Sequence, residues 1–428
     1  MIESFFWRKM LAKSGLGKYV PAVKKTLNGG EEYLSLLADR TLAAPLTELL
    51  DRALLPDINT PDSIHLALGS PRCEIYPSLP RTINDRRPSA WGDYELRAEL
   101  ADGFRRDHGV EHEPADEVFI THGATGAFAA VLDAFVNPGD RVVLFDPTSP
   151  VFSLGLKHRR ASVAWVPTAS EDGFVRFALN DLMRAMRGAK MIVLADPANP
   201  TGCVFASEDL EQIAFWAKKN DTLIVQDMSF DRWRNDPAKS RLANLPHTEG
   251  RIISIGSFAK SHGLSAARVG WLAGYRHLVR PCALAALMNA PFVAPLCQQV
   301  VTQALRMGEV AMNSTRDDLN DRREYVSERL RGMGLLPWAA RAGFFFWTPV
   351  PTGETSRAFA QRLLTETGVL VNPGEVFGPS GSRFVRISFA VDEGRLREGM
   401  ARLEGFVRAG SSNGGLESRL AAGEHAVQ

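Results

Sequence analysis

The stretch IISIGSFAKSHGLSAARVGWLAG, residues 252–274, is the most informative part of the sequence. Two apolar runs, 252–256 and 269–273, frame a segment of small residues that carries one lysine, Lys260. Runs as apolar as these are typical of strands that are covered on both faces of a sheet. A solvated lysine usually belongs to a charged helical face, but Lys260 has no charged neighbour until Arg268. Chemistry and chance are the two explanations for such a placement.

The composition is that of an ordinary globular enzyme. Hydrophobic residues make up 45% and charged residues 23% of the 428 residues, close to the average for folded proteins. The formal net charge is +1, from 50 Lys and Arg against 49 Asp and Glu. This balance gives no reason to expect a nucleic acid or an anionic membrane as partner. The length is sufficient for two domains.

Cysteine usage and the apolar runs indicate a cytoplasmic protein. The four cysteines are widely spaced and form no C-x-x-C pair, so we expect neither a metal site nor a disulfide framework. The N-terminus lacks the apolar core and cleavage site of a secretory signal. The longest apolar stretch, residues 281–297, is broken by two internal prolines and Asn289. A membrane span needs about 20 uninterrupted apolar residues, so we expect a packed helix and loop at a subunit interface.

Short apolar runs alternate with helical patterns between about residues 117 and 275. This alternation predicts an α/β fold with a mostly parallel sheet sandwiched by helices. The runs are 118–121, 142–145, 191–195, 223–227, 252–255 and 269–273.

The pattern changes after about residue 325. A long charged helix is followed by GFFFWTPV, a helix near 356–367 and FVRISFAV, which together predict a smaller α+β domain. The Gly/Ser/Ala-rich end of the chain is typical of a loose tail. We therefore expect an N-terminal helical segment that packs on the small domain, a large domain, a small domain and a flexible tail, at residues 1–60, 61–325, 326–408 and 409–428.

Ligands of open α/β sheets lie outside the carboxyl ends of the strands, so the residues that follow each run are candidates for a site. The first run is followed by Gly123-Ala124-Thr125, which opens a helix. Exposed backbone N–H groups and a threonine hydroxyl suit an anion, best a phosphate. An ordinary helix start after a glycine turn is the alternative.

An amide follows the run 191–195, and a carboxylate ends the run 223–227. Asn199 lies between two prolines that fix the backbone and aim the side chain, although a plain turn also explains it. Asp227 ends a buried type of strand, which is unfavourable for a carboxylate unless it meets a cation or a strong donor. A protonated pyridine nitrogen is such a partner, and a helix cap or salt bridge is the alternative.

The lysine segment completes the set. Ser257 and Arg268 can add hydroxyl and guanidinium donors to the same phosphate. Lys260 can form a Schiff base with an aldehyde, provided that burial and nearby positive charge keep its pKa low. A cofactor with a phosphate, a basic ring nitrogen and an aldehyde is pyridoxal 5'-phosphate.

The segment SFAKSHGLSAARVG resembles the lysine signature of fold type I pyridoxal-phosphate enzymes, specifically the class I/II aminotransferases. The NPTG motif at 199–202, Asp227, the GAT turn at 123–125 and Arg386 in FVRISF match the same family in the same order. The resemblance covers roughly residues 60–405. It implies an aminotransferase-like fold with a seven-stranded sheet, and a homodimer.

The resemblance also implies roles for individual residues. Lys260 would carry the cofactor as an aldimine and shuttle the proton, while Asp227 would hold the pyridinium nitrogen. Asn199 would bond the ring 3'-oxygen, and Arg386 would clamp the substrate carboxylate. Gly69, in HLALGSP, matches the family's glycine near that carboxylate. The expected reaction moves the amino group of an L-amino acid to a 2-oxo acid.

Three positions depart from the family pattern. Phe230 stands where a tyrosine usually bonds the 3'-oxygen, and Ser149 stands where an aromatic ring usually stacks on the cofactor. Phe152 is a candidate replacement for that ring. The tyrosine that a partner subunit usually lends to the phosphate is missing before Gly92, where Arg86 or Arg87 is a candidate replacement.

These departures keep an alternative function open. RRPSAWGDYELR and GVLVNPGEVFG are similar to a side branch that contains capreomycidine synthase and other arginine-modifying enzymes. In that branch the same cofactor supports cyclisation, elimination or oxidation of arginine or a hydroxylated arginine. A serine acyl enzyme built on the Ser257-x-x-Lys260 pattern lacks the later S-D-N and K-T-G motifs. A binding-only protein is disfavoured because Lys260 and Arg386 are both retained.

Overall fold

The computed structural model describes residues 63–67, 69–71, 73, 89–235, 242–308, 310–351 and 353–423. The described residues belong to one compact unit. The predicted N-terminal helical segment, 1–60, lies outside the described residues, as do Arg86 and Arg87.

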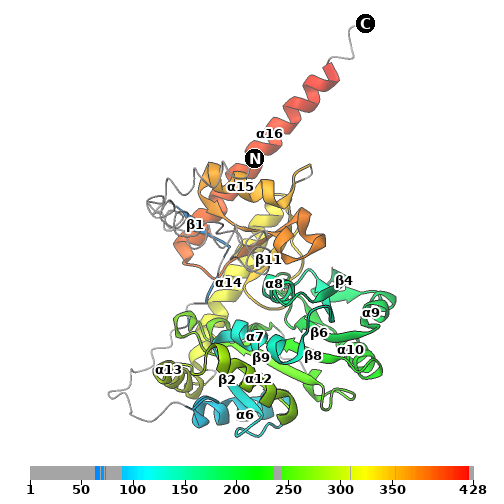
Figure 1. Ribbon diagram of the computed structural model, residues 1–428. Helices are drawn as coiled ribbons and strands as arrows, with labels where there is room; N and C mark the ends of the chain where they lie inside the picture. The colour runs from blue at the N-terminus through cyan, green and yellow to red at the C-terminus, as the bar shows by residue number, and fades with distance from the viewer. Residues whose placement is uncertain are drawn as a thin grey trace, which may run out of the picture. The chain divides into compact units, whose positions relative to one another are not determined.

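The main sheet of the described residues has nine strands in the order β2-β10-β9-β8-β6-β3-β4-β5-β7. Its strands β2, β9, β8, β6 and β4 are labelled in Figure 1. The seven strands from β2 to β4 correspond to the seven-stranded sheet that the family resemblance implies, and β5 and β7 extend it. Neighbouring strands from β9 to β4 are parallel, whereas β10 is antiparallel to both of its neighbours. The bounds are β2 Val118–Thr121, β3 Arg141–Asp146, β4 Ser162–Glu171, β5 Phe174–Phe177, β6 Ala189–Ala195, β7 Val204–Phe205, β8 Leu223–Asp227, β9 Ile252–Ser257 and β10 Gly270–Gly274.

Successive residues of the central strands pack on opposite faces, which explains their unbroken apolar character. In β3, Val142 and Leu144 join one core cluster, while Val143 and Phe145 join the other. Helices α7 (Gly123–Phe135), α8 (Pro150–His158) and α12 (Arg276–Asn289) contribute to the first cluster. Helices α9 (Leu179–Met186) and α10 (Ser207–Lys219) contribute to the second. The prediction of a sheet sandwiched by helices is confirmed.

The β2 end of the sheet has a cluster of its own. Helices α6 (Tyr94–His108) and α13 (Pro295–Arg306) pack against each other there, with residues of β2 and β10.

Strand β4 is the one long strand that the sequence does not predict. It is only partly buried, because exposed and buried residues mix along it, and Pro167 interrupts its hydrophobic pattern. Its first residues still pair with the whole of β3, from Arg141–Ser162 to Asp146–Pro167. Long-range pairing thus makes a strand of a segment whose own pattern is weak.

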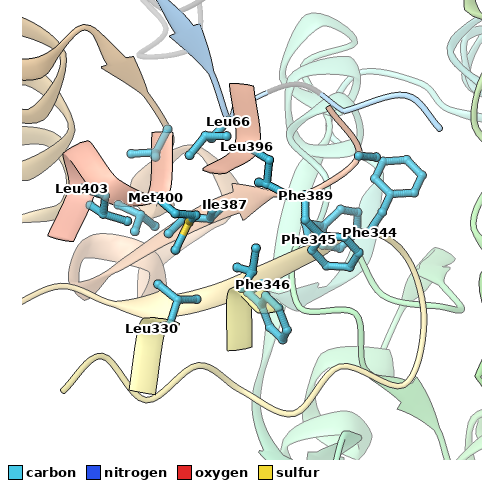
Figure 2. Packing of buried hydrophobic residues seen from close by; sticks show 14 of the residues in the cluster. Leu66, Leu330, Phe344, Phe345, Phe346, Ile387, Phe389, Leu396, Met400 and Leu403 are labelled. Carbon is cyan, nitrogen blue, oxygen red and sulfur yellow. The ribbon is translucent and has the colours of Figure 1, made fainter. Parts of the chain in front are cut away.

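The second group of elements surrounds a three-stranded sheet in the order β11-β14-β13. Figure 2 shows its core, in which Ile387 of the central strand lies with Leu330, Met400 and Leu403. The elements are α14 (Val310–Gly332), β11 (Phe345–Pro349), α15 (Ser356–Thr367), β13 (Asn372–Pro373), β14 (Phe384–Ser388) and α16 (Glu393–Gly423), with β1 (Ile64–His65) paired to β12 (Val369–Leu370). This is the predicted α+β arrangement.

Two predicted boundaries fall inside helices. Residue 325 lies within α14, so the division between the domains stays a prediction. Helix α16 continues to Gly423, whereas the sequence predicted a loose tail from residue 409. The segment LESRLAAG is rich in good helix formers, which outweigh the glycines before it.

Short helices lie between several strands. Helix η3 (Asp231–Trp233) follows β8, η4 (Leu242–Asn244) precedes β9, and α11 (Phe258–Ser261) and η5 (Ser265–Ala267) follow β9, whereas η6 (Gly374–Phe377) and η7 (Pro379–Arg383) lie between β13 and β14 of the small sheet. Because β6, β8 and β9 are parallel, the residues after all three reach the same edge of the sheet.

Candidate active site

Lys260 lies on the short helix α11, directly after β9. Its Nζ donates a hydrogen bond to the carbonyl oxygen of Gly69 at 3.0 Å. Burial, followed by the positive charges of Arg386 and Arg268, lowers the pKa of Lys260 to about 8. A lysine amine with this pKa is available in its unprotonated form close to neutral pH, as a nucleophile or a proton acceptor requires.

Gly69 must be a glycine for Lys260 to have this neighbour. A Cβ atom at Gly69 would lie 1.9 Å from Oγ of Ser388 and 3.2 Å from the side chain of Phe344. The missing side chain brings the backbone against β14 and leaves its carbonyl oxygen pointing at Lys260.

Asp227 ends β8. Its Oδ1 accepts hydrogen bonds from the backbone N–H and the hydroxyl of Ser229, at 2.9 and 2.6 Å. Within the described residues Oδ2 accepts none. Burial raises the pKa of Asp227, although both bonds from Ser229 act against it. A cationic group at Oδ2 would stabilise the carboxylate, which is what a pyridinium nitrogen offers.

An anion cradle forms where α7 begins. Gly123 has φ +70°, and a Cβ atom there would lie 3.2 Å from Nη2 of Arg268 and 3.8 Å from Oγ of Ser257. The backbone N–H groups of Ala124 and Thr125 belong to the open first turn of the same helix. One guanidinium, one hydroxyl and a helix N-terminus therefore converge, as a phosphate requires.

Arg268 reaches the cradle from an unfavourable backbone conformation. Its φ of 53° is in the left-handed region that non-glycine residues rarely adopt. Residues held in such conformations cluster at functional sites.

Arg386 is held in the middle of β14 by contacts on several sides. Nη1 donates to Oδ1 of Asn199 at 2.7 Å, and Nη2 donates to the carbonyl oxygen of Ala67 at 2.8 Å. The rings of Phe345 and Phe377 lie 5.2 and 5.0 Å from the guanidinium carbon. Burial lowers the pKa of Arg386 to about 10, so the side chain stays charged at neutral pH.

Part of the donor capacity of Arg386 is unused. Its buried Nε has no hydrogen-bond partner among the described residues. A buried donor without a partner is unfavourable, so the guanidinium is prepared for an acceptor. The bond to Arg386 occupies Oδ1 of Asn199, which leaves the Nδ2 amide of Asn199 as the group that can donate to a ligand.

The structure thus brings most of the predicted residues together in two groups. One is the Gly123, Ser257 and Arg268 cradle, and the other is Lys260 with Gly69, Arg386 and Asn199. The charge of Arg268 links the two groups because it acts on Lys260. Asp227 ends β8, the strand beside β9. Sequence reasoning missed the contacts of Ala67, Phe345 and Phe377 with Arg386. Neither a backbone oxygen nor a buried phenylalanine has a sequence signal that distinguishes it from ordinary core residues.

The departures from the family pattern have structural counterparts. Phe230 packs edge-on against Phe344 and Phe345, with ring centroids 5.4 and 5.1 Å apart. Ser149 is buried just before α8. Phe152 is 2% exposed and packs on Phe128 in the core. The suggestion that Phe152 stacks on the cofactor is therefore wrong, because its ring is turned into the first core cluster.

The described residues offer neither a cluster of metal ligands nor a membrane-spanning helix. They contain no group of three or more His, Cys, Asp or Glu side chains placed to hold a metal ion. None of their helices is both long enough and apolar enough to cross a membrane.

The fold is that of the fold type I transferases that depend on pyridoxal phosphate. Within this class, the chain belongs to the aminotransferase class I and II family, whose sequence model matches residues 84–403. It is therefore an aminotransferase-family enzyme, as the lysine segment predicted.

Relatives in this family carry different substrate names. The chain is 29% identical over 319 residues to an aspartate aminotransferase of Pyrococcus abyssi, covering 73% of this chain and 82% of that protein. It is also 29% identical over 350 residues to an LL-diaminopimelate aminotransferase of Nitratidesulfovibrio vulgaris, covering 81% and 88%.

Solved structures agree on the fold. An aspartate aminotransferase from Thermotoga maritima superposes with a TM-score of 0.78 at 25% identity, covering 88% of this chain and all (100%) of that one. An aromatic aminotransferase from Pyrococcus horikoshii gives a TM-score of 0.75 at 26% identity, covering 88% and 99%.

Proposed function

We propose that the enzyme moves the amino group of an L-amino acid to a 2-oxo acid, with pyridoxal 5'-phosphate held at the cradle and at Lys260. The phosphate would lie over Gly123, Ala124 and Thr125, bonded by Ser257 and Arg268. The ring nitrogen would meet Asp227, and the ring oxygen would accept from Asn199. The support is the fit of the donor set: a charged cradle that a single Cβ would fill, and a half-buried carboxylate with an open oxygen.

When bound, the cofactor supplies an aldehyde carbon that takes up the amino group and a ring that accepts electrons from the α-carbon. Asp227 would hold the ring nitrogen in its protonated form, and the positive ring nitrogen would favour the ionised carboxylate against the burial that raises the pKa of Asp227. Lys260 Nζ moves the proton from the substrate α-carbon. A pKa of about 8 lets this amine both accept and release a proton near neutral pH.

Arg386 would bind the substrate carboxylate. Two aromatic contacts and two hydrogen bonds fix the guanidinium plane before any ligand arrives, and a guanidinium binds carboxylate with two parallel bonds. Preorganised donors cost little ordering on binding. Relatives are named for aspartate and for LL-diaminopimelate, which share the α-amino carboxylate group, and this is the part of the substrate that Arg386 would bind.

One observation carries the proposal. The amine of Lys260 lies between the carbonyl of Gly69 and the charges of Arg386 and Arg268, and therefore has a lowered pKa. Buried lysines with a structural role are usually paired with a carboxylate, and Lys260 forms no ion pair with a carboxylate of the described residues.

The test is a visible absorbance spectrum of the purified enzyme loaded with pyridoxal 5'-phosphate, before and after adding single amino acids that include arginine and hydroxylated arginines. We expect at least one donor to convert the cofactor to its amine form and release the matching 2-oxo acid. A cyclised, eliminated or oxygen-consuming product without the amine form would instead support the arginine-modifying alternative.

We further propose a homodimer in the cytoplasm. Leu284, Met288 and Phe292 are 59%, 86% and 46% exposed, and they belong to the apolar stretch expected at a subunit interface. Clusters of exposed large apolar side chains mark interaction sites. The four cysteines are free thiols, which fits a reducing compartment. Light scattering of the purified protein tests the dimer.

A further inference from the structure

The helix that carries Lys260 is too short to be stable without contacts from other segments. Helix α11 contains four residues, Phe258–Ser261. The last four carbonyl groups of any helix lack partners within the helix, and one turn is unfavourable by itself. The direction of the Lys260 side chain therefore depends on whatever bonds the carbonyl groups of this turn.

The four carbonyl groups from Ser257 to Lys260 each have an identifiable partner. The Ser257 oxygen accepts from the hydroxyl of Ser261 at 3.1 Å, and the Phe258 oxygen accepts from two backbone N–H groups. The Ala259 oxygen accepts from two hydroxyls, those of Ser70 at 3.3 Å and Ser265 at 3.2 Å.

The carbonyl of Lys260 itself is bonded from a different part of the chain. Nε1 of Trp233 donates to it at 2.7 Å, the shortest of these bonds. Within the described residues this is its one partner. The Ala259 oxygen keeps one hydrogen bond if either hydroxyl is removed, whereas the Lys260 oxygen loses its one bond among the described residues if the indole N–H is removed.

Trp233 is in turn fixed from several sides. Its side chain is 2% exposed in the core of the small sheet, and its carbonyl accepts from the N–H of Gly343 at 3.0 Å. The next residue, Arg234, bridges Asp231 and Asp196, each at 2.7 Å. Asp196 begins the turn that carries Asn199. The neighbouring residues Trp233 and Arg234 therefore contact both the Lys260 turn and the Asn199 turn.

We propose that Trp233 is a positioning residue of this enzyme, whose indole N–H holds the main-chain carbonyl of Lys260 and thereby fixes the direction in which the lysine amine reaches. The inference rests on the proposed function in so far as Lys260 is the catalytic amine. A buried tryptophan that merely satisfies its own N–H would stabilise the fold without affecting catalysis, and the experiment separates the two roles.

The first test compares Trp233→Phe with Ser265→Ala in the enzyme loaded with pyridoxal 5'-phosphate. Trp233→Phe keeps a ring but removes the donor, whereas Ser265→Ala removes one of the two hydroxyls on the Ala259 carbonyl. We expect Trp233→Phe to lower kcat about tenfold or more and to change KM less than about twofold, because Arg386 binds the carboxylate from another element. Ser265→Ala should stay within about threefold of the wild type.

A second measurement does not depend on turnover. The cofactor-free proteins are treated with propanal and cyanoborohydride at a series of pH values, and modification of Lys260 is followed by peptide mass spectrometry. In the wild type, burial and the facing charges of Arg386 and Arg268 should place half-maximal modification near pH 8. In Trp233→Phe the amine should move away from this buried, positively charged position, so the midpoint of Lys260 modification should rise by about one pH unit.

The outcomes are distinguishable. A folded Trp233→Phe protein with the kcat and the labelling midpoint of the wild type would overturn the inference. So would a Trp233→Phe protein in which only KM rises, or a Ser265→Ala protein that loses as much kcat as Trp233→Phe. If the wild type shows no turnover with any donor, the proposed function fails, while the labelling midpoints still decide the role of Trp233. If Trp233→Phe does not fold, benzothienylalanine at position 233 keeps the indole shape without its N–H and is read in the same way.

Discussion

Two cationic groups of the site, Arg386 and Lys260, are held in opposite ways. Arg386 lies in the middle of β14, paired on one side with β11 and on the other with β13, with aromatic rings against its guanidinium. Lys260 lies on a single helical turn whose carbonyl groups are bonded by side chains from other segments.

This difference follows from what each group has to do. A carboxylate clamp works best when its plane is fixed before binding, which a central strand provides. A lysine that moves a proton must approach and leave the reacting carbon, which a side chain on a short turn can do. The comparison predicts that changes at Lys260 affect chemistry, whereas changes at Arg386 affect binding.

The largest expected effect is that of Lys260→Ala. Turnover should fall by more than about 10⁴-fold, because the nucleophile and the proton carrier are lost together. Lys260→Arg is the matched control, since it keeps the charge and should be as inactive. The measurement is the rate of 2-oxo acid formation, and substantial residual activity in either variant would contradict the assignment of Lys260.

Arg386→Ala should act mainly on binding. Loss of two charge-assisted bonds predicts a KM for the amino acid that is about 10- to 100-fold higher. Arg383→Ala, just before β14, is the control, because Arg383 bonds an exposed backbone oxygen at 3.3 Å. Steady-state kinetics decides the matter: an unchanged KM in Arg386→Ala would mean that the carboxylate is held elsewhere.

The pH dependence of cofactor attachment sharpens the same comparison. Only the unprotonated amine attacks an aldehyde, and the pKa of Lys260 is lowered to about 8. Below pH 8 the rate of attachment to the cofactor-free protein should rise about tenfold per pH unit, and above it the rate should level off. Stopped-flow absorbance measures this, and a rate that still rises at pH 10 would indicate a lysine with an ordinary pKa.

The smallest effect is expected for Phe230→Tyr. The added hydroxyl should change kcat by less than about fivefold. If position 230 faces the cofactor oxygen, the pH midpoint of the cofactor absorbance band should move lower, because the new donor stabilises the charged oxygen. An unchanged midpoint with a lower melting temperature would show that the hydroxyl is buried against Phe344 and Phe345 instead.

Much of the fold was predictable because the strands of the main sheet are apolar on both faces. The run at 223–227 coincides with β8, and the helix expected near 356–367 coincides with α15. Strand β4 was missed because its pattern is mixed, and the end of α16 was missed because glycines masked a helix-forming segment. In both cases, longer-range context or local propensity overrode a weak pattern.

The candidate site was predictable where a residue follows a strand and carries chemistry, as Asp227 and Lys260 do. It was not predictable where a residue acts through the backbone of another. Nothing in the sequence separates Trp233 from other core tryptophans, and Phe152 looked available to stack on a ring until its packing on Phe128 was known.

The sequence by itself determined which chemical groups stand at the ends of the strands, because hydrophobic pattern and turn residues are local properties. Only the tertiary structure decided that Arg386 lies beside Asn199 and that Trp233 bonds the carbonyl of Lys260. Those contacts join segments far apart in the chain, and they depend on how the cores around the two sheets pack, which no local pattern records.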